Sequence, residues 1–289
     1  MIEIAFDTGK IQVSGEIDIF CAEELRKAIK EHGFDRDFLI DLTRVKYIDS
    51  SGIGVFISLH NHFEQLGIRF SIEPSESLRK IFKVSKLDTL FFTTAPRVTD
   101  AIIYHDCFIA DTKVLAVVID KLFNDLGQAG YEEEETQEIV VAVDEAITNA
   151  VLETIKVTGD VVEDLSSSFS IDQVKSIAVC WEITDKDFHA TVLDHGSGLD
   201  LHAVEEQLPE ASHQDYLTQV SEHQKKGNIR LRLNGEEIEL KRLGAGLKIM
   251  ASFMDSILID LIDAKGAVSD KVGSTTLGTI LNLYRARRN

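Results

Sequence analysis

The stretch Val143-Asp144-Glu145-Ala146-Ile147-Thr148-Asn149-Ala150 decides how the second half of this chain is organised. Glu145 and Asn149 are four positions apart among apolar and small residues, so they project from one face of a helix. The carboxylates of Glu132–Glu135 complement the dipole at its start, and the pattern predicts a helix that runs to about Ile155. A carboxylate and an amide on one face could activate a hydroxyl and bind a hard cation such as Mg²⁺. Taken alone, this spacing is also typical of a solvent-facing helix.

Outward from this helix, the chain alternates strands with helices. Apolar periodicity predicts helices over Thr112–Leu126 and Gly246–Met254, and strands over Ser176–Thr184, Phe188–Asp194, Ser256–Ile262 and Thr276–Tyr284. A polar stretch, Val157–Asp172, lies between the long helix and the strand at Ser176–Thr184. A long segment, Leu199–Leu243, lies between the strand at Phe188–Asp194 and the helix at Gly246–Met254, and it includes a hairpin-like part at Ile229–Leu240.

The first hundred residues have a different pattern, typical of a small layered α/β unit. Strands are predicted at Ile2–Phe6, Lys10–Val13, Phe38–Leu42, Arg69–Ile72 and Thr89–Thr93, and helices at Ala22–Glu31, Ile53–Phe63, Ser77–Val84 and Val98–Tyr104.

Composition limits the possible functions. The formal net charge of −19 argues against binding a nucleic-acid backbone. Residues 1–104 carry 13 basic and 16 acidic side chains and the remainder 17 and 33, which favours a domain boundary near residue 100. No apolar run is long enough to span a membrane, and no signal peptide is recognisable. The widely spaced Cys21, Cys107 and Cys180 are typical of reduced thiols, so we expect a cytoplasmic protein.

Three short motifs could hold a nucleotide. Asp194-x-Gly196-x-Gly198 ends a predicted strand, where glycines let backbone approach a ligand and the carboxylate can accept from an amino group. Gly244-x-Gly246 opens a predicted helix, whose first N–H groups can hold phosphate. Arg242 just upstream could neutralise a transferring phosphoryl group. Each motif alone is also compatible with a tight turn.

Together and in this order, the motifs give residues 107–289 a resemblance to the Bergerat-fold (GHKL) ATPases, specifically the anti-sigma-factor serine kinases. Val143–Ala150 resembles the family's N box, Leu193–Asp200 its G1 box, Arg242–Asp255 its G2 box and Leu277–Leu281 its closing Gly-Thr motif.

The resemblance implies bound ATP and Mg²⁺ and a role for each residue. Glu145 would be the catalytic base, Asn149 the Mg²⁺ ligand and Asp194 the partner of the adenine amino group. A cradle for the nucleotide would be shaped by Gly196, Gly198, Gly244 and Gly246. Arg242 would lie near the terminal phosphate and Thr279 near the adenine. Two departures stand out: Leu199–Leu243 is long for this branch, and Glu153 occupies a place where many relatives have His.

Residues 1–104 resemble a STAS domain of the anti-sigma-antagonist kind. The resemblance is carried by Gly15-Glu16-Ile17-Asp18, Asp41-Leu42 and Tyr47-Ile48-Asp49-Ser50-Ser51-Gly52-Ile53-Gly54. It implies that Ser50 is a phosphoacceptor, at a helix start that can tolerate phosphate. The other interpretation is that Asp49-Ser50-Ser51 only caps the helix.

We therefore expect a mixed α/β (α+β) chain: a small STAS-type sheet with packed helices over 1–104, then a Bergerat-fold two-layer sandwich over 105–289. The predicted function is an ATP- and Mg²⁺-dependent protein-serine kinase of a bacterial partner-switching pathway. Its partners would be a STAS-domain or sigma-factor-type protein and a serine phosphatase, with no nucleic acid and no membrane. The alternative is a non-catalytic switch in which ATP or ADP selects the partner. Because the connector Thr94–Asp106 is short, transfer to Ser50 could require a homodimer.

Overall fold

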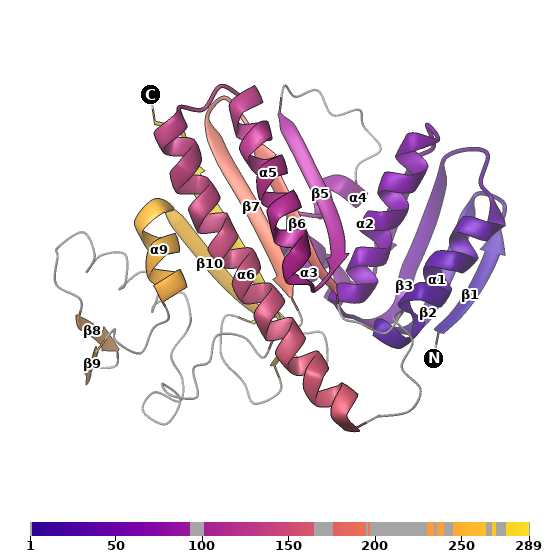
Figure 1. Ribbon diagram of the computed structural model, residues 1–289. Helices are drawn as coiled ribbons and strands as arrows, with labels where there is room; N and C mark the ends of the chain where they lie inside the picture. The colour runs from indigo at the N-terminus through magenta and orange to yellow at the C-terminus, as the bar shows by residue number, and fades with distance from the viewer. Residues whose placement is uncertain are drawn as a thin grey trace.

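The computed structural model describes residues 2–92, 101–164, 176–194, 196, 230–233, 236–239, 245–263, 268–269 and 276–288, which form two α/β domains (Figure 1). The N-terminal domain contains β1 (Ile2–Asp7), β2 (Lys10–Ile17), α1 (Ile19–His32), β3 (Phe38–Ile48), α2 (Ser50–Gln65), β4 (Phe70–Pro74), α3 (Glu76–Val84) and α4 (Asp88–Phe91). The C-terminal domain contains β5 (Ile102–Ile109), α5 (Thr112–Gln128), α6 (Glu133–Asp164), β6 (Ser176–Ile183), β7 (Asp187–Asp194), β8 (Arg230–Leu233), β9 (Glu236–Glu239), α9 (Ala245–Phe253), β10 (Ser256–Asp263), β11 (Val268–Ser269) and β12 (Thr276–Ala286). The expected mixed α/β architecture is confirmed.

The N-terminal sheet has the order β1-β2-β3-β4, with an antiparallel first pair and parallel pairs after it. Ile17 at the end of β2 pairs with Ile48 at the end of β3. Because α1 and α2 follow these strands directly, both helices begin at the same end of the sheet. Each start has an aspartate cap: Asp18 accepts from the N–H of Cys21, and Asp49 from the N–H of Gly52.

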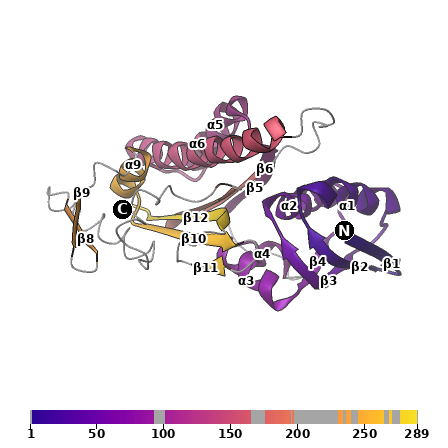
Figure 2. The same ribbon diagram turned by 90° about the horizontal axis from the view of Figure 1, so that it is seen from below.

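The C-terminal sheet is antiparallel throughout, in the order β11-β10-β12-β7-β6-β5. Helices α5, α6 and α9 lie on one of its faces (Figure 2). Alternate residues of β6 supply the core beneath them, including Val179 and Trp181, which are buried. The indole of Trp181 donates to the buried Asp125 carboxylate at 3.0 Å and stacks on Tyr104. The space between this face of the sheet and helices α5 and α6 is filled by a hydrophobic core.

The opposite face of this sheet packs on the N-terminal domain. Ala178, Leu193 and Ile280 belong to the same buried cluster as the interior of the N-terminal domain. Hydrogen bonds to backbone carbonyls cross the interface: Asn61 Nδ2 donates to His105 O (3.2 Å), Lys80 Nζ to Val268 O (2.7 Å) and Asn282 Nδ2 to Val84 O (3.1 Å). The interior of the N-terminal domain therefore continues onto this face of the C-terminal sheet, while the core under α5 and α6 is a second cluster on the other face.

Helix α2 makes the closest approach to that sheet, against β5 and β6. A Cβ atom added at Gly54 would overlap Cys107 Sγ and lie 3.2 Å from Cys107 Cβ. Only a residue without a side chain fits at this point of α2.

Two elements differ from the sequence-based expectations. The segment predicted as a strand at Thr89–Thr93 contains the helix α4, in which Leu90 and Phe91 are buried. A pair of apolar residues is compatible with either structure, and here packing of the Phe91 ring against Phe56 and Phe82 selects the helix. Thr93 lies outside the described residues.

The helix predicted at Val98–Tyr104 is wrong where the structure describes it, because Ile102–Tyr104 begin strand β5. Ile102 and Tyr104 face the core under α5 and α6, while Ile103 alternates away from them, and all three residues pair with β6. The polar stretch from Val157 also begins as helix, since α6 continues to Asp164. No proline interrupts this part of α6, so polarity alone does not end it.

The approach of α2 to β5 predicts a compensating pair of substitutions. Gly54→Ala should lower the melting temperature, because overpacking costs about 1–3 kcal/mol, whereas Gly54→Ala with Cys107→Ala should recover part of the loss. Calorimetry of the two single variants and the double variant measures the coupling. Gly127→Ala is the matched control, since an added Cβ there meets nothing within 4 Å. A Gly54→Ala variant as stable as Gly127→Ala would show that α2 does not contact β5 closely.

Candidate functional site

Three polar residues lie along one face of α6, the long helix that covers the C-terminal sheet. Glu145, Asn149 and Glu153 follow one another at intervals of four, which places them over about 12 Å of helix. Asn149 is exposed, while Glu145 and Glu153 are half-buried. Each end of this row meets a different glycine motif.

The first end of the row meets the start of α9. A Cβ atom added at Gly246 would overlap the Glu145 carboxylate and lie 2.9 Å from Asn149 Nδ2. The glycine therefore lets the first turn of α9 lie directly against both side chains. Oxygen donors and helix N–H groups are brought together at this point, a combination suited to phosphate and a hard cation.

The other end of the row meets the end of β7. Asp194 is buried and pairs in register with Thr279 on β12. Its Oδ1 accepts from the N–H of Gly196 at 2.6 Å. A Cβ atom on Gly196 would lie 2.7 Å from Glu153 Cβ, and one on Gly278 would lie 2.8 Å from the Asp194 carbonyl oxygen. Both glycines are required by this close packing.

The Asp194 carboxyl, next to the Glu153 end of the row, has a perturbed pKa. Burial raises the pKa of Asp194 to about 7, and the negative charge of Glu153 adds to the rise. Hydrogen bonds from the Gly196 N–H and from Thr279 oppose it. A buried carboxyl at the end of a strand, between two glycines, can accept a hydrogen bond from the amino group of a ligand.

The predicted residues are thus partly assembled. The structure brings Glu145, Asn149 and Gly246 together, and separately Asp194, Gly196 and Thr279. Gly198, Arg242 and Gly244 lie outside the described residues. The hairpin expected in the long segment is present as the antiparallel pair β8 and β9.

Ser50 is the first residue of α2, and its side chain lies outside the description. Its neighbours Asp49 and Ser51 are buried. Because Gly54 on the same helix contacts Cys107 on the outward face of the sheet, the start of α2 and the row on α6 lie on opposite faces of that sheet.

Comparison with known proteins agrees with this division of the chain. Residues 109–269 match the family described as histidine kinase-like ATPase domain. The chain belongs to that family. Residues 2–101 match the STAS domain family, so a STAS domain precedes the ATPase domain.

Relatives of the STAS domain include the anti-sigma-B factor antagonist of Bacillus subtilis (strain 168), which is 31% identical over 90 residues, covering 30% of this chain and 81% of that protein. Among solved structures, the unphosphorylated anti-sigma factor antagonist SpoIIAA is 23% identical, with a TM-score of 0.28. The match covers 32% of this chain and 85% of that chain. The SiaB–SiaC complex of Pseudomonas aeruginosa is 12% identical, with a TM-score of 0.32, and the match covers 62% of this chain and 88% of that chain.

The two families establish the general nature of the chain. A histidine kinase-like ATPase domain implies ATP binding, and its fusion to a STAS domain of the anti-sigma-antagonist type fits a partner-switching regulator. Among the described helices, none combines the length and apolar character that crossing a membrane requires.

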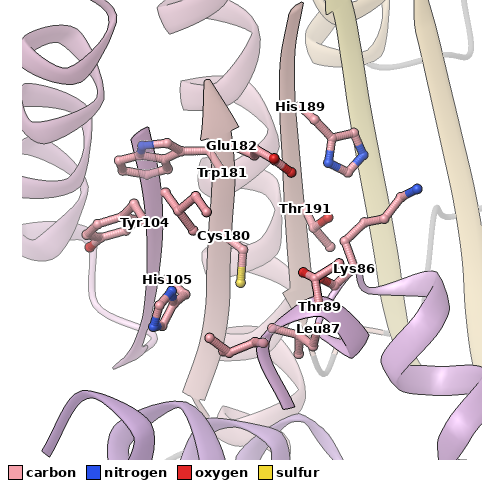
Figure 3. A pocket seen from close by; sticks show the side chains of 12 residues that line it. Lys86, Leu87, Thr89, Tyr104, His105, Cys180, Trp181, Glu182, His189 and Thr191 are labelled. Carbon is pink, nitrogen blue, oxygen red and sulfur yellow. The ribbon is translucent and has the colours of Figure 1, made fainter. Parts of the chain in front are cut away.

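A separate pocket of about 220 Å³ lies between the two domains, away from the row on α6 (Figure 3). Lys86, Leu87 and Thr89 of the STAS domain line one side, and residues of β5, β6 and β7, including His105 and His189, line the other. Burial lowers the pKa of His189 to about 4, which keeps this imidazole neutral at neutral pH.

Sequence reasoning left one residue of the row without a role. Glu153 contacts Gly196 and raises the pKa of Asp194, so it belongs to the end of the candidate site next to β7. Its position eight residues after Glu145 on a continuous helix was the available signal.

The raised pKa of Asp194 predicts a specific pH dependence of stability. From about pH 4 to pH 7 the folded chain holds a proton on Asp194 that the unfolded chain has lost, so this group's contribution to the free energy of unfolding falls as the pH rises. Asp194→Asn removes the titration and should flatten the pH profile over this range. Denaturant unfolding at several pH values measures it, with the exposed Asp185→Asn as control. Parallel profiles for wild type and Asp194→Asn would contradict the raised pKa.

Proposed function

We propose that this protein is an ATP- and Mg²⁺-dependent protein-serine kinase of a partner-switching pathway, with Ser50 as a phosphoacceptor. The observation that carries the proposal is the packing of Gly246 against Glu145 and Asn149, which leaves a base and a cation ligand beside a helix start. We also propose that the STAS domain ends ahead of Ile102 rather than after Tyr104, because β5 pairs with β6 of the ATPase sheet.

The donor set fits the cofactors that the family implies. The amide oxygen of Asn149 and the carboxylate of Glu145 are oxygen ligands of the type that Mg²⁺ accepts. The N–H groups at the start of α9 suit phosphate oxygens, and the buried Asp194 suits the adenine amino group. Bound Mg·ATP supplies the phosphoryl group and the charge neutralisation for its transfer.

The residues of the chain then have distinct tasks. Glu145 would accept the proton of the attacking serine hydroxyl while the serine oxygen bonds to the γ-phosphorus, and the bond from that phosphorus to the bridging oxygen would break with ADP as the leaving group. Asn149 would position the cation, while Asp194, Gly196 and Thr279 would orient the adenine of the nucleotide. Arg242 retains its proposed place near the terminal phosphate, and Gly198 and Gly244 retain theirs in the nucleotide cradle, on the strength of the family resemblance.

The position of the STAS domain limits which serine can react. The start of α2 packs on the outward face of the sheet, and Glu145 lies over the inward face. Asp49 and Ser51 are buried in the docked arrangement. We therefore expect phosphate to pass between chains, within a homodimer or to a separate STAS protein, after the acceptor helix is released.

Phosphorylation in turn would change partner binding. A phosphoserine next to Asp49 places like charges together and adds a desolvation cost at any interface that covers the start of α2. A sigma-factor-type protein is the proposed output and a serine phosphatase the enzyme that restores the acceptor.

A non-catalytic switch is the second candidate. It is favoured by Glu153, which departs from the His of many relatives and contacts the glycine next to Asp194. In that case ATP or ADP occupancy alone would select the partner.

Incubation with Mg·ATP followed by phosphopeptide mapping separates the two candidates. We expect phosphate on Ser50 in the wild type, a loss of rate of about 10²–10⁴-fold in Glu145→Ala with nucleotide binding retained, and loss of both in Gly246→Ala, because the new Cβ displaces Glu145. Gly127→Ala is the matched glycine control. Tight nucleotide binding without any phosphoprotein, with STAS partners added, would reject the kinase and support the switch.

A further inference from the structure

A cluster of histidine and carboxylate side chains joins the two domains at a place distant from the nucleotide motifs. His60 and Glu64 lie one turn apart on α2 of the STAS domain, and His105 lies on β5 of the ATPase domain. One ligand atom from each residue lies within 4.8 Å of the others. His60 Nδ1 is 3.2 Å from His105 Nε2 and 3.8 Å from Glu64 Oε2.

These separations match the ligand spacing of a tetrahedral metal ion. Nitrogen and oxygen donors bound to Zn²⁺ at 2.0–2.2 Å are about 3.3 Å from one another in a tetrahedron. The two imidazole nitrogens already have this spacing. Glu64 Oε2 is farther from His60 Nδ1 than this spacing and has to move closer to bind the same ion; its side chain is 70% exposed, which leaves it room to do so.

The packing around the cluster supports the His60 ring and the backbone of His105. The backbone carbonyl of His105 accepts from Asn61 Nδ2, which fixes β5 next to α2. The His60 ring has edge contacts with Phe70 and Phe91, and its plane is at 79° to that of His105. Ligand side chains supported in this way by surrounding contacts favour metal binding over a mobile surface cluster.

We propose that His60, Glu64 and His105 form a Zn²⁺ site that fastens the STAS domain to the ATPase domain. Two imidazoles and one carboxylate are a donor set suited to Zn²⁺ rather than to Mg²⁺ or Ca²⁺, which prefer oxygen donors. Three protein ligands leave one position for water or for a fourth donor.

The site has a regulatory consequence because its ligands come from both domains. An ion bound to His105 of β5 and to His60 and Glu64 of α2 stabilises the docked arrangement only, by the general effect of a ligand that binds one state. Asp49 and Ser51 at the start of α2 are buried in that arrangement. Bound Zn²⁺ therefore holds the predicted acceptor region against the sheet.

Zinc binding is measured on the full-length chain, with any affinity tag removed and after chelator treatment. Calorimetric titration with Zn²⁺ gives affinity and stoichiometry, and the absorption spectrum with Co²⁺ reports tetrahedral coordination. We expect one ion per wild-type chain, and a melting temperature that rises with Zn²⁺. Glu64→Gln and His105→Ala should weaken binding by at least about tenfold. His62→Ala, two positions along α2, is the matched control and should bind as the wild type does.

Because Glu64 is exposed, loss of zinc binding in Glu64→Gln cannot be attributed to misfolding. No Zn²⁺ binding by the wild-type chain would overturn the site and leave a hydrogen bond between two imidazoles. Equal zinc affinity in Glu64→Gln, His105→Ala and His62→Ala would overturn it too, since the ion would be bound elsewhere. None of these results depends on kinase activity, so the zinc site and the proposed function can fail separately.

Discussion

The close packing of α2 against β5 and β6 holds the STAS domain on the outward face of the ATPase sheet. The six-stranded sheet is apolar on both faces, and a sheet of this kind needs a cover on each. Helices α5, α6 and α9 cover one face, and the STAS domain covers the other. The cover on the second face is possible at this distance because Gly54 has no side chain where Cys107 projects from β5. The domains are layers of one packed unit.

This arrangement separates the two halves of the proposed reaction. The row on α6, from Glu145 to Glu153, lies over the inward face of the sheet, while the start of α2 lies on the outward face. In the proposed reaction, the nucleotide site of one chain would therefore phosphorylate the serine of another chain, although each chain contains both. The proposed zinc site at His60, Glu64 and His105 would act on this same docking, because it stabilises the state in which the acceptor region is covered.

The sequence predicted most of the described elements, and the structure brings some of the predicted site residues together at two places. Amphipathic periodicity located α1, α2 and α5, and the carboxylates of Glu132–Glu135 located the start of α6, because these signals are local. Short segments failed: the residues of α4 and the start of β5 take their structure from burial of Phe91 and from pairing with β6, which are tertiary effects. The partnership of Glu153 with Gly196, and of His60 with His105, could not be predicted either, because each joins elements far apart in the sequence.

In the proposed reaction the acceptor and the donor lie on opposite faces of one sheet, so phosphate passes between chains. The most direct test mixes two variants, Glu145→Ala, which keeps Ser50, and Ser50→Ala, which keeps Glu145, and follows phosphate on Ser50. We expect phosphorylation in the mixture although neither variant is phosphorylated at Ser50 alone, and in the wild type an initial rate per chain that rises with protein concentration. Phosphorylation of the wild type at a rate per chain independent of concentration, with none in the mixture, would contradict the account.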